Sequence, residues 1–320
     1  MRAAVFHAPG DVRIEPVPEP AAPGPGELLI RVSKAALCGT DSAEWDHGPL
    51  LARPPVILGH EVTGQVVAAG AGVTGFAAGH RVVSGAGISC GRCTWCAAGR
   101  TNLCASYQTL GLHRHGGLAE YVLSPASICR VVPDELDDVG AAMAQPLAVA
   151  LHAARRGRVA PGRSCVVIGA GGIGAFIVAA LGATHLVNAE GGDQVREVLS
   201  ADPEGAHVVI EASGAPGSPA AALEMVRRGG DVVIVGLQHH PFGIDLFSVA
   251  TREVDMHGTL AHVCGEDLSE AVSVLAGTPL ARTVLGDVIP LGDLVDGGLR
   301  PLAERKAHGK IVVDLEGSLA

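Results

Sequence analysis

Residues 164–174 read Ser-Cys-Val-Val-Ile-Gly-Ala-Gly-Gly-Ile-Gly, so an apolar run passes without a break into a glycine-rich turn. The run predicts a buried parallel strand, and the glycines predict a turn that opens a helix. Backbone amides at such a turn, together with the helix N-terminus, can meet a pyrophosphate. Two further apolar runs, over 207–213 and 231–237, carry glycine or small residues near their ends. The pattern predicts a dinucleotide-binding domain, whose cofactor-binding residues are Gly169, Gly171, Gly172, Ile173 and Gly174.

Length and composition narrow the class of protein. The chain has 320 residues and a mass of 32.3 kDa, which predicts two domains sharing a cleft. Its 48% hydrophobic and 18% charged residues exclude a disordered chain. The formal net charge of −10 argues against nucleic acid as a partner, because phosphate recognition needs basic residues in excess. The N-terminus lacks the apolar segment of a secretory signal, and glycines interrupt the uncharged stretch 164–183. We therefore expect no membrane span and a cytoplasmic protein.

Four of the eight cysteines lie close together, with two residues between Cys90 and Cys93, two before Cys96 and seven before Cys104. Short steps of this kind allow successive thiolates to surround one tetrahedral ion. The alternative is a loop of reduced thiols. Without a sign of secretion, metal binding is favoured over disulfides. Because four thiolates leave no position for substrate, the spacing predicts a structural zinc in a lobe near 88–106.

A second group of possible metal ligands is spread along the chain. Cys38 precedes Thr40 and Asp41, and His60-Glu61 follow some twenty residues later. Cysteine, histidine and a carboxylate would leave one zinc position open, as in catalytic sites, and Asp41 could orient a ligand. Isolated cysteines and histidines are more often packing residues. The residues by themselves leave both interpretations open.

Several motifs in order point to one family. They are Cys38-Gly-Thr-Asp41, Trp45-Asp-His-Gly48, Gly59-His-Glu-Val-Thr-Gly64, Gly116-Gly-Leu-Ala-Glu-Tyr121, Gln145-Pro-Leu-Ala-Val-Ala-Leu-His152 and His308-Gly-Lys-Ile-Val-Val-Asp314, together with the four-cysteine lobe and the glycine turn. Over nearly its whole length the chain resembles the zinc-dependent medium-chain alcohol dehydrogenases, especially the sorbitol, threonine and butanediol dehydrogenase branch.

The resemblance implies an α/β fold in two parts. A GroES-like, mostly β catalytic domain would comprise 1–149 and 263–320. A Rossmann doubly wound nucleotide-binding domain would comprise 150–262. The resemblance further implies two zinc ions per chain, NAD or NADP as cofactor, and a homo-oligomer, either a dimer or a tetramer. The reaction would be oxidation of a secondary alcohol, polyol or amino alcohol to a ketone, or the reverse.

Family residues can be carried over where the motifs match. Cys38 and His60 match catalytic zinc ligands, and Glu61 matches the carboxylate that binds zinc in sorbitol-type members. Thr40 matches the hydroxyl that begins the proton relay. A histidine of that relay is replaced by Ala43, and the usual glutamate is replaced by Gln145. Gln145 can hydrogen bond but brings no negative charge. We hypothesise that it is a catalytic residue that makes the zinc more acidic.

Besides the replacements at Ala43 and Gln145, the chain departs from the family pattern in its nucleotide domain. Roughly two dozen residues that relatives have there are absent. They include the second strand and its ribose-binding acid, which lies about 20 residues beyond the glycines. In one interpretation the segment is lost, either from the chain or from the reported sequence, and Leu186-Val-Asn188 keeps its later place. In the other, His185–Ala189 forms the second strand and Glu190 is the ribose acid. The choice between NAD and NADP stays open. So does a non-catalytic alternative, a zinc-stabilised binding or scaffold protein with a degraded nucleotide site.

Overall fold

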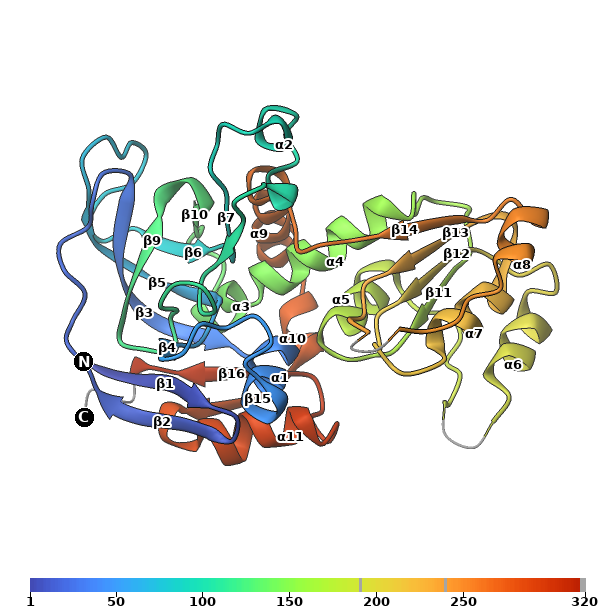
Figure 1. The fold of residues 1–320 in the computed structure, drawn as a ribbon. Coiled ribbons are helices and arrows are strands. Elements are labelled where there is room, and N and C mark those ends of the chain that lie inside the picture. Colours follow the sequence, from blue (N-terminus) through green and yellow to red (C-terminus); the bar gives the residue numbers. More distant parts are fainter. Residues whose placement is uncertain (190–191, 239–240, 317–320) are drawn as a thin grey trace. The chain divides into compact units, whose positions relative to one another are not determined.

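The computed structural model describes residues 1–189, 192–238 and 241–316, and the chain divides into two compact units (Figure 1). The N-terminal unit comprises Met1–Ala148 and Ala261–Ala320, and the inserted unit comprises Val149–Leu260. The sequence-based boundaries, at 149/150 and 262/263, differ from these by one and two residues. Among the described residues, no helix has the length and apolar character to cross a membrane.

Strands form most of the N-terminal unit. A small sheet has the order β2-β1-β4, with β1 (Arg2–Ala8), β2 (Asp11–Pro16) and β4 (Val56–Ile57). The larger sheet has the order β10-β6-β5-β3-β16-β15, with β10 (Cys129–Val131), β6 (Arg81–Ser84), β5 (Glu61–Ala69), β3 (Glu27–Ala36), β16 (Lys310–Asp314) and β15 (Leu285–Pro290), and β9 (Tyr121–Pro125) also pairs with β3. A two-stranded sheet joins β7 (Gly87–Ile88) and β8 (Gln108–Thr109).

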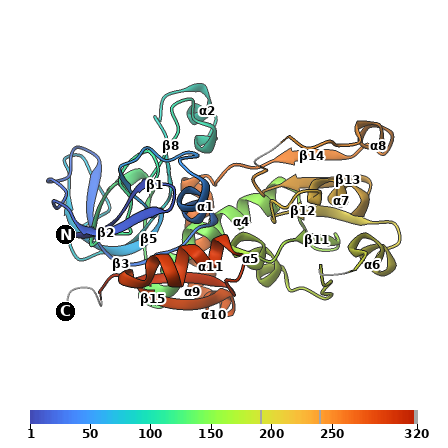
Figure 2. The ribbon, with the colours of Figure 1, turned by 60° about the horizontal axis from the view of Figure 1, so that its bottom comes forward.

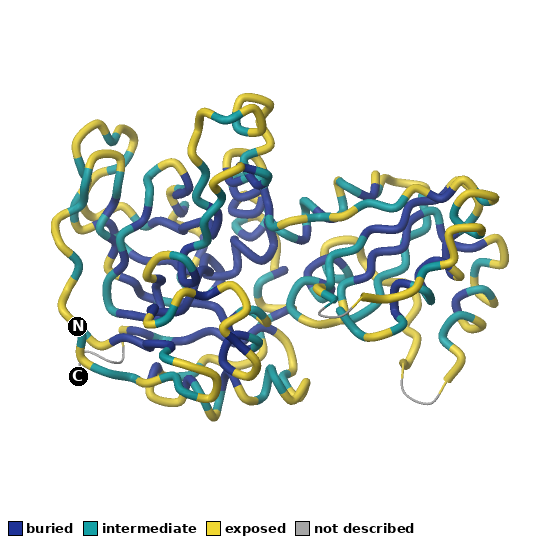
Figure 3. The backbone as a smooth tube through the Cα atoms, in the orientation of Figure 1, coloured by how far each residue is buried: buried dark blue, intermediate teal, exposed yellow. Residues whose placement is uncertain are grey.

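Strand β3 brings distant parts of the chain together. Its end residue Ala36 pairs with Glu61 of β5 on one side and with Val312 of β16 on the other. Alternate residues of β3 are buried, among them Leu28 and Ile30, and they join one continuous core that includes both ends of the unit. Figure 3 shows the central strands of the unit as buried and its long loops as exposed. The burial pattern determines which face of β3 enters the core, and the pairing places β5 and β16 beside its end.

Helices of this part of the chain are mostly short. They are α1 (Gly39–His47), α2 (Thr94–Ala97), α3 (Asp138–Ala142), α9 (Ser269–Gly277), α10 (Leu280–Val284) and α11 (Arg300–Ala303), and α4 (Ala144–Arg156) continues past Ala148 into the inserted unit. Single turns of 3₁₀ helix cover Thr101–Leu103, Ala126–Ile128 and Leu291–Asp293, and π-helical turns cover Cys264–Leu268 and Leu294–Leu299. Helix α1 begins directly after Cys38, which is its N-cap residue.

The inserted unit is a parallel sheet with helices (Figure 2). Its order is β11-β12-β13-β14, with β11 (Cys165–Ile168), β12 (Ala206–Glu211), β13 (Val226–Ile234) and β14 (Asp255–Gly258). Its helices are α5 (Gly172–Leu181), α6 (Gln194–Ala201), α7 (Ser218–Met225) and α8 (Leu246–Thr251). A core of small and branched residues, including Val209 and Val232, fills the space between sheet and helices.

The sheet is shorter than the usual doubly wound sheet, whose strand order is 3-2-1-4-5-6. Since the glycine turn follows β11, this strand is the first, and β12, β13 and β14 take the places of the last three. Every residue of β11 is half-buried, because a strand that normally lies centrally is an edge strand here. Residues 185–189 form no strand, so the interpretation that they replace the second strand is wrong. Nor do residues 186–188 form the later strand. Glu190 lies outside the described residues.

Candidate metal and dinucleotide sites

The structure brings Cys38, His60 and Glu61 together. Their ligand atoms all lie within 4.8 Å of one another. Cys38 follows β3, and His60-Glu61 begin β5, so the antiparallel pairing of these strands produces the cluster. Bond lengths of 2.0–2.3 Å put the ligand atoms of a tetrahedral zinc about 3.5 Å apart, which this cluster can match with small side-chain adjustments. His60 and Glu61 are buried, and Cys38 is half-buried.

Asp41 connects two members of the cluster. The side chain is fully buried, and its oxygens accept hydrogen bonds from the backbone amides of Cys38, at 3.0 Å, and Gly59, at 3.4 Å. Oδ1 lies 3.5 Å from Nδ1 of His60. Burial alone would raise the pKa of Asp41, but the charge of His60 and the hydrogen bonds hold it below its ordinary value. Asp41 therefore orients the backbone at Cys38 and the ring of His60 at once.

The electrostatics of the cluster favour a positive charge. Burial would lower the pKa of His60, but the neighbouring Asp41 and Cys38 outweigh it and raise that pKa well above its ordinary value. Glu61 has a buried oxygen, Oε1, without a hydrogen-bond partner among the described residues. A buried carboxylate oxygen normally has a donor or a metal. These side chains therefore fit a cation such as zinc.

Lys310 lies on the other side of Glu61. Its Nζ is 2.6 Å from Oε2 of Glu61, and both side chains are buried. Sequence reasoning did not identify Lys310 as part of the site. The only available signal was its place in the motif that closes the chain, because β16 reaches the cluster through its pairing with β3.

Of the two predicted catalytic residues, Thr40 has an observed contact with the cluster, and Gln145 has none recorded among the described residues. The hydroxyl of Thr40 lies 3.6 Å from the Cys38 sulfur, a hydrogen-bonding distance for sulfur, so Thr40 borders the cluster. Gln145 is buried on the first turn of α4. A role for Gln145 at the cluster stays a prediction.

The four cysteines of the lobe also converge. Their sulfurs lie within 4.8 Å of one another, with Cys93 and Cys96 at 3.5 Å, and all four are free thiols. Backbone amides of Cys90 and Ser106 donate to the sulfur of Cys104 at 3.2 and 3.3 Å. Amide donors also lower the pKa of Cys93 to about 6, whereas burial and neighbouring thiols raise that of Cys96 to about 11. Four thiolates this close need a cation, so the set fits a structural zinc.

Three glycines shape the turn after β11. A Cβ on Gly169, which has a φ of +93°, would lie 2.7 Å from the side chain of Ser213. A Cβ on Gly174 would lie 1.8 Å from the carbonyl oxygen of Gly169. These two glycines are therefore required by close packing. A Cβ on Gly171 would meet nothing within 4 Å, so the N-terminus of α5 faces open space that a phosphate could occupy.

Glu211 supports the neighbouring loop and was missed by the sequence reasoning. It ends β12, is fully buried, and its Oε1 accepts hydrogen bonds from the amides of Ser213 and Gly214 and from the hydroxyl of Ser218. The carboxylate therefore fixes the loop against which the glycine turn packs. An acidic residue at the end of an apolar strand was the signal for this role.

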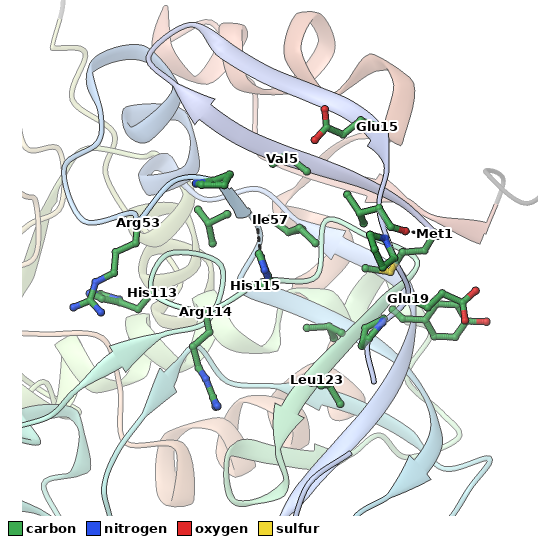
Figure 4. A pocket seen from close by; sticks show the side chains of 18 of the residues that line it. Met1, Val5, Glu15, Glu19, Arg53, Ile57, His113, Arg114, His115 and Leu123 are labelled. Carbon is green, nitrogen blue, oxygen red and sulfur yellow. Dashed lines mark hydrogen bonds between the residues drawn. The ribbon is translucent and has the colours of Figure 1, made fainter. Parts of the chain in front are cut away.

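A cavity of about 900 Å³ opens elsewhere in the N-terminal unit (Figure 4). It is lined by Met1, Glu15, Arg53, Ile57 and His113, among others, and by no member of the Cys38 cluster. The amide of Ile57 donates to Nδ1 of His115 at 3.2 Å on its wall. Its lining brings no group of metal ligands together among the described residues.

Comparison with known proteins places these sites in a family. Residues 24–134 match the family model for the alcohol dehydrogenase GroES-like domain, and residues 160–277 match that for zinc-binding dehydrogenases. Sorbitol dehydrogenase of Bacillus subtilis (strain 168) is 32% identical, with 81% of each chain covered. L-threonine 3-dehydrogenase of Xanthomonas euvesicatoria is 30% identical, with 94% of this chain and 95% of that one covered. That alignment runs over 330 positions, more than the 320 residues of this chain, so the relative has residues that this chain lacks.

Solved structures give the same result. An alcohol dehydrogenase from Thermus sp. ATN1 matches with a TM-score of 0.89 and 30% identity, over 98% of this chain and 99% of that one. A zinc-binding dehydrogenase from Sinorhizobium meliloti 1021, bound to NADP, matches with a TM-score of 0.87 and 30% identity, over 98% of both chains. With its GroES-like and Rossmann-type parts, the chain belongs to the zinc-dependent medium-chain alcohol dehydrogenase family and is an oxidoreductase acting on CH–OH groups.

Proposed function

We propose that the cluster of Cys38, His60 and Glu61 is the catalytic metal centre of a dehydrogenase that converts a secondary alcohol, polyol or amino alcohol into a ketone, or the reverse. Two observations carry this assignment. The ligand atoms of the three side chains lie within 4.8 Å of one another, and Oε1 of Glu61 is buried without a hydrogen-bond donor among the described residues. Zinc at this position would act as a Lewis acid toward the alcohol oxygen.

The residues around the cluster would position its ligands, adjust its charge and transfer the substrate proton. Asp41 holds the backbone of Cys38 and the ring of His60 in place. Lys310 holds the second oxygen of Glu61 and offsets the charge that this carboxylate would bring to the site. Thr40, beside the Cys38 sulfur, would accept the proton of the substrate hydroxyl while passing its own proton to solvent, because Ala43 offers no relay group. Gln145 supplies no charge, so we assign it the role of keeping the site more positive than a glutamate would.

The four-cysteine lobe is proposed to hold a second, structural zinc, which gives two zinc ions per chain. All four sulfurs are converging free thiols, so the position has no room for a substrate. Such an ion would stabilise a segment that contains little regular structure of its own, namely α2 and a single 3₁₀ turn.

NAD or NADP is proposed as the cofactor, bound at the turn Gly169–Gly174 with Gly172 and Ile173 on the first turn of α5.

We further propose a homo-oligomer, dimer or tetramer, because β14 ends the sheet of the inserted unit and could pair with the same strand of a second copy. Free cysteines throughout the described chain favour a reducing compartment, the cytoplasm. The similarity comparisons offer nothing in favour of a non-catalytic scaffold.

The test combines metal content with turnover. Wild-type protein should hold two zinc ions and show an alcohol-dependent change in nicotinamide absorbance with at least one member of a panel of diols, polyols and amino alcohols. His60→Ala should hold one zinc and show no turnover. The control is His80→Ala, because His80 is an exposed histidine outside the family motifs, and it should behave as wild type. A wild-type protein with both zinc ions and bound NADH that is silent with the whole panel would contradict the proposal.

A further inference from the structure

The inserted unit has the element that binds the pyrophosphate of a dinucleotide but lacks, among its described residues, the one that binds the adenosine ribose. In a doubly wound sheet the ligand lies across the carboxyl ends of the strands, where the strand order reverses. The pyrophosphate meets the turn after the first strand, and an acidic residue at the end of the second strand holds the adenosine ribose. The first of these elements is present here, and the second is absent from the described residues.

The pyrophosphate half is built for close approach of a ligand. The loops after β11 and β12 touch at Gly169 and Ser213, and Glu211 holds the second loop from beneath. Gly171 faces open space, and no side chain caps the helix N-terminus there, so the first amides of α5 are left for an anion. The structure therefore supports recognition of phosphate groups at this turn.

The ribose half has neither its strand nor its carboxylate. β11 is the edge strand of the described sheet, and all of its residues are only half-buried. The chain between α5 and the gap at 190–191 is irregular and exposed, and Leu186 is 89% exposed. Residues 182–189 contain no acidic side chain that could bind a ribose diol and no lysine or arginine that could bind a 2′-phosphate.

Glu190 lies outside the described residues, and the next acidic side chain in the described part is already engaged. Asp193 is the N-cap of α6, and its Oδ1 accepts a hydrogen bond from the amide of Arg196 at 3.1 Å. A residue that satisfies a helix N-terminus is held in place by that bond. One oxygen of Asp193 is therefore already used at the N-terminus of α6.

We infer that this site binds nicotinamide nucleotides through the phosphates and does not read the adenosine ribose, so that NADH and NADPH bind with similar affinity. The inference rests on the proposed cofactor function and specifies its selectivity. A hydrogen bond from a carboxylate to the ribose would by itself give about tenfold discrimination or more, and the described residues offer no such bond.

The experiment measures binding directly, on the full-length zinc-loaded protein. Dissociation constants for NADH, NADPH and reduced nicotinamide mononucleotide are obtained by fluorescence titration. The dissociation constants of NADH and NADPH should differ by less than about threefold. Reduced nicotinamide mononucleotide lacks the adenosine half and one phosphate, and it should bind more weakly. Less than about tenfold of this loss in affinity should come from the adenosine half. A preference of about tenfold or more for NADH or for NADPH would overturn the inference.

Variants establish that the glycine turn is the site being measured. In Gly171→Val the new side chain enters the open space without meeting protein atoms, so the fold should survive and both dinucleotides should lose at least about tenfold in affinity. The control Gly277→Val also meets nothing within 4 Å, but lies at the end of α9 in the N-terminal unit, and should bind as wild type. Zinc content should be unchanged in both.

The outcomes separate the inference from the proposed function. Strong selectivity for one dinucleotide overturns the inference alone and leaves the dehydrogenase proposal standing. Unchanged binding to Gly171→Val also overturns the inference, because the phosphates would then be held elsewhere. Failure of wild-type protein to bind any of the three nucleotides, together with silence in the turnover assay, overturns both.

Discussion

Nζ of Lys310 lies 2.6 Å from Oε2 of Glu61, and both side chains are buried although the two residues are far apart in the sequence. A buried charge without a partner is strongly destabilising. Glu61 is therefore bound from one side by this lysine, and Oε1 remains for a cation on the other side.

Replacement of Lys310 tests this arrangement. Lys310→Met should lower the free energy of unfolding of metal-free protein by about 3–5 kcal/mol, because Glu61 is left buried and unpaired. The loss should be smaller in zinc-loaded protein, in which the metal neutralises the carboxylate. Urea unfolding of both forms measures the difference.

Lys306→Met is the matched control. Lys306 pairs with Glu304 on the surface, where an ion pair contributes about 0–1 kcal/mol. An equally small effect of Lys310→Met, with or without zinc, would refute the idea that Glu61 depends on this lysine.

Removal of one lobe thiolate tests the structural zinc. Cys93→Ser should lower the zinc content by one ion per chain and the Tm by at least about 5 °C, because metal binding by such a lobe contributes to folding. Metal analysis and thermal unfolding provide the readout. Cys165→Ser, which removes a free thiol outside the lobe, should leave the zinc content unchanged. A full zinc complement in Cys93→Ser would show that the lobe holds no ion.

A charge at position 145 tests the proposed tuning role of Gln145. If Gln145 borders the metal as proposed, Gln145→Glu would add a negative charge there. That charge would disfavour loss of a proton from a metal-bound group, so the alkaline limb of the pH–rate profile should move upward by about one pH unit. Gln65→Glu adds the same charge farther along β5, where Gln65 contacts Arg31, and should leave the limb in place. An unmoved limb in Gln145→Glu would refute the hypothesis.

Asp231 should make the stability of the inserted unit sensitive to acid. Its buried carboxylate contacts Arg158, Arg163 and His257, with 2.7 Å to each of the last two. Burial would raise the pKa of Asp231, but these partners hold it below the ordinary value of 3.8. The carboxylate therefore stabilises the fold at pH values above 3.8, and this contribution is lost as the pH falls through the lowered folded-state pKa.

Asp231→Asn measures that contribution. At pH 6 the variant should unfold with about 2–4 kcal/mol less free energy than wild type, and the difference should shrink as the pH falls below about 4. Zinc loss in acid affects both proteins and cancels in the difference. Asp296→Asn, at an exposed pair with Arg300, should show little effect at any pH. A difference for Asp231→Asn that does not depend on pH would contradict the assignment.

The sequence alone is sufficient for features that depend on near neighbours. The spacing of Cys90, Cys93, Cys96 and Cys104 predicts a metal lobe, and the structure brings these sulfurs within 4.8 Å. The run 164–174 predicts a strand, a turn and a helix, and β11 and α5 confirm that prediction. Local spacing suffices because each feature is completed within a few residues of backbone.

Features that depend on strand pairing required the tertiary structure. Residue types left Cys38 and His60 open between packing and metal binding, and the register of β3 with β5 is what places them around one point. Lys310 reaches Glu61 only because β16 pairs with the other edge of β3. The choice between a shortened sheet and a replaced strand was likewise decided by pairing, since β11 remains an edge. Pairing depends on which distant faces can be buried together, so the hydrophobic pattern of one segment does not by itself identify the segment with which it pairs.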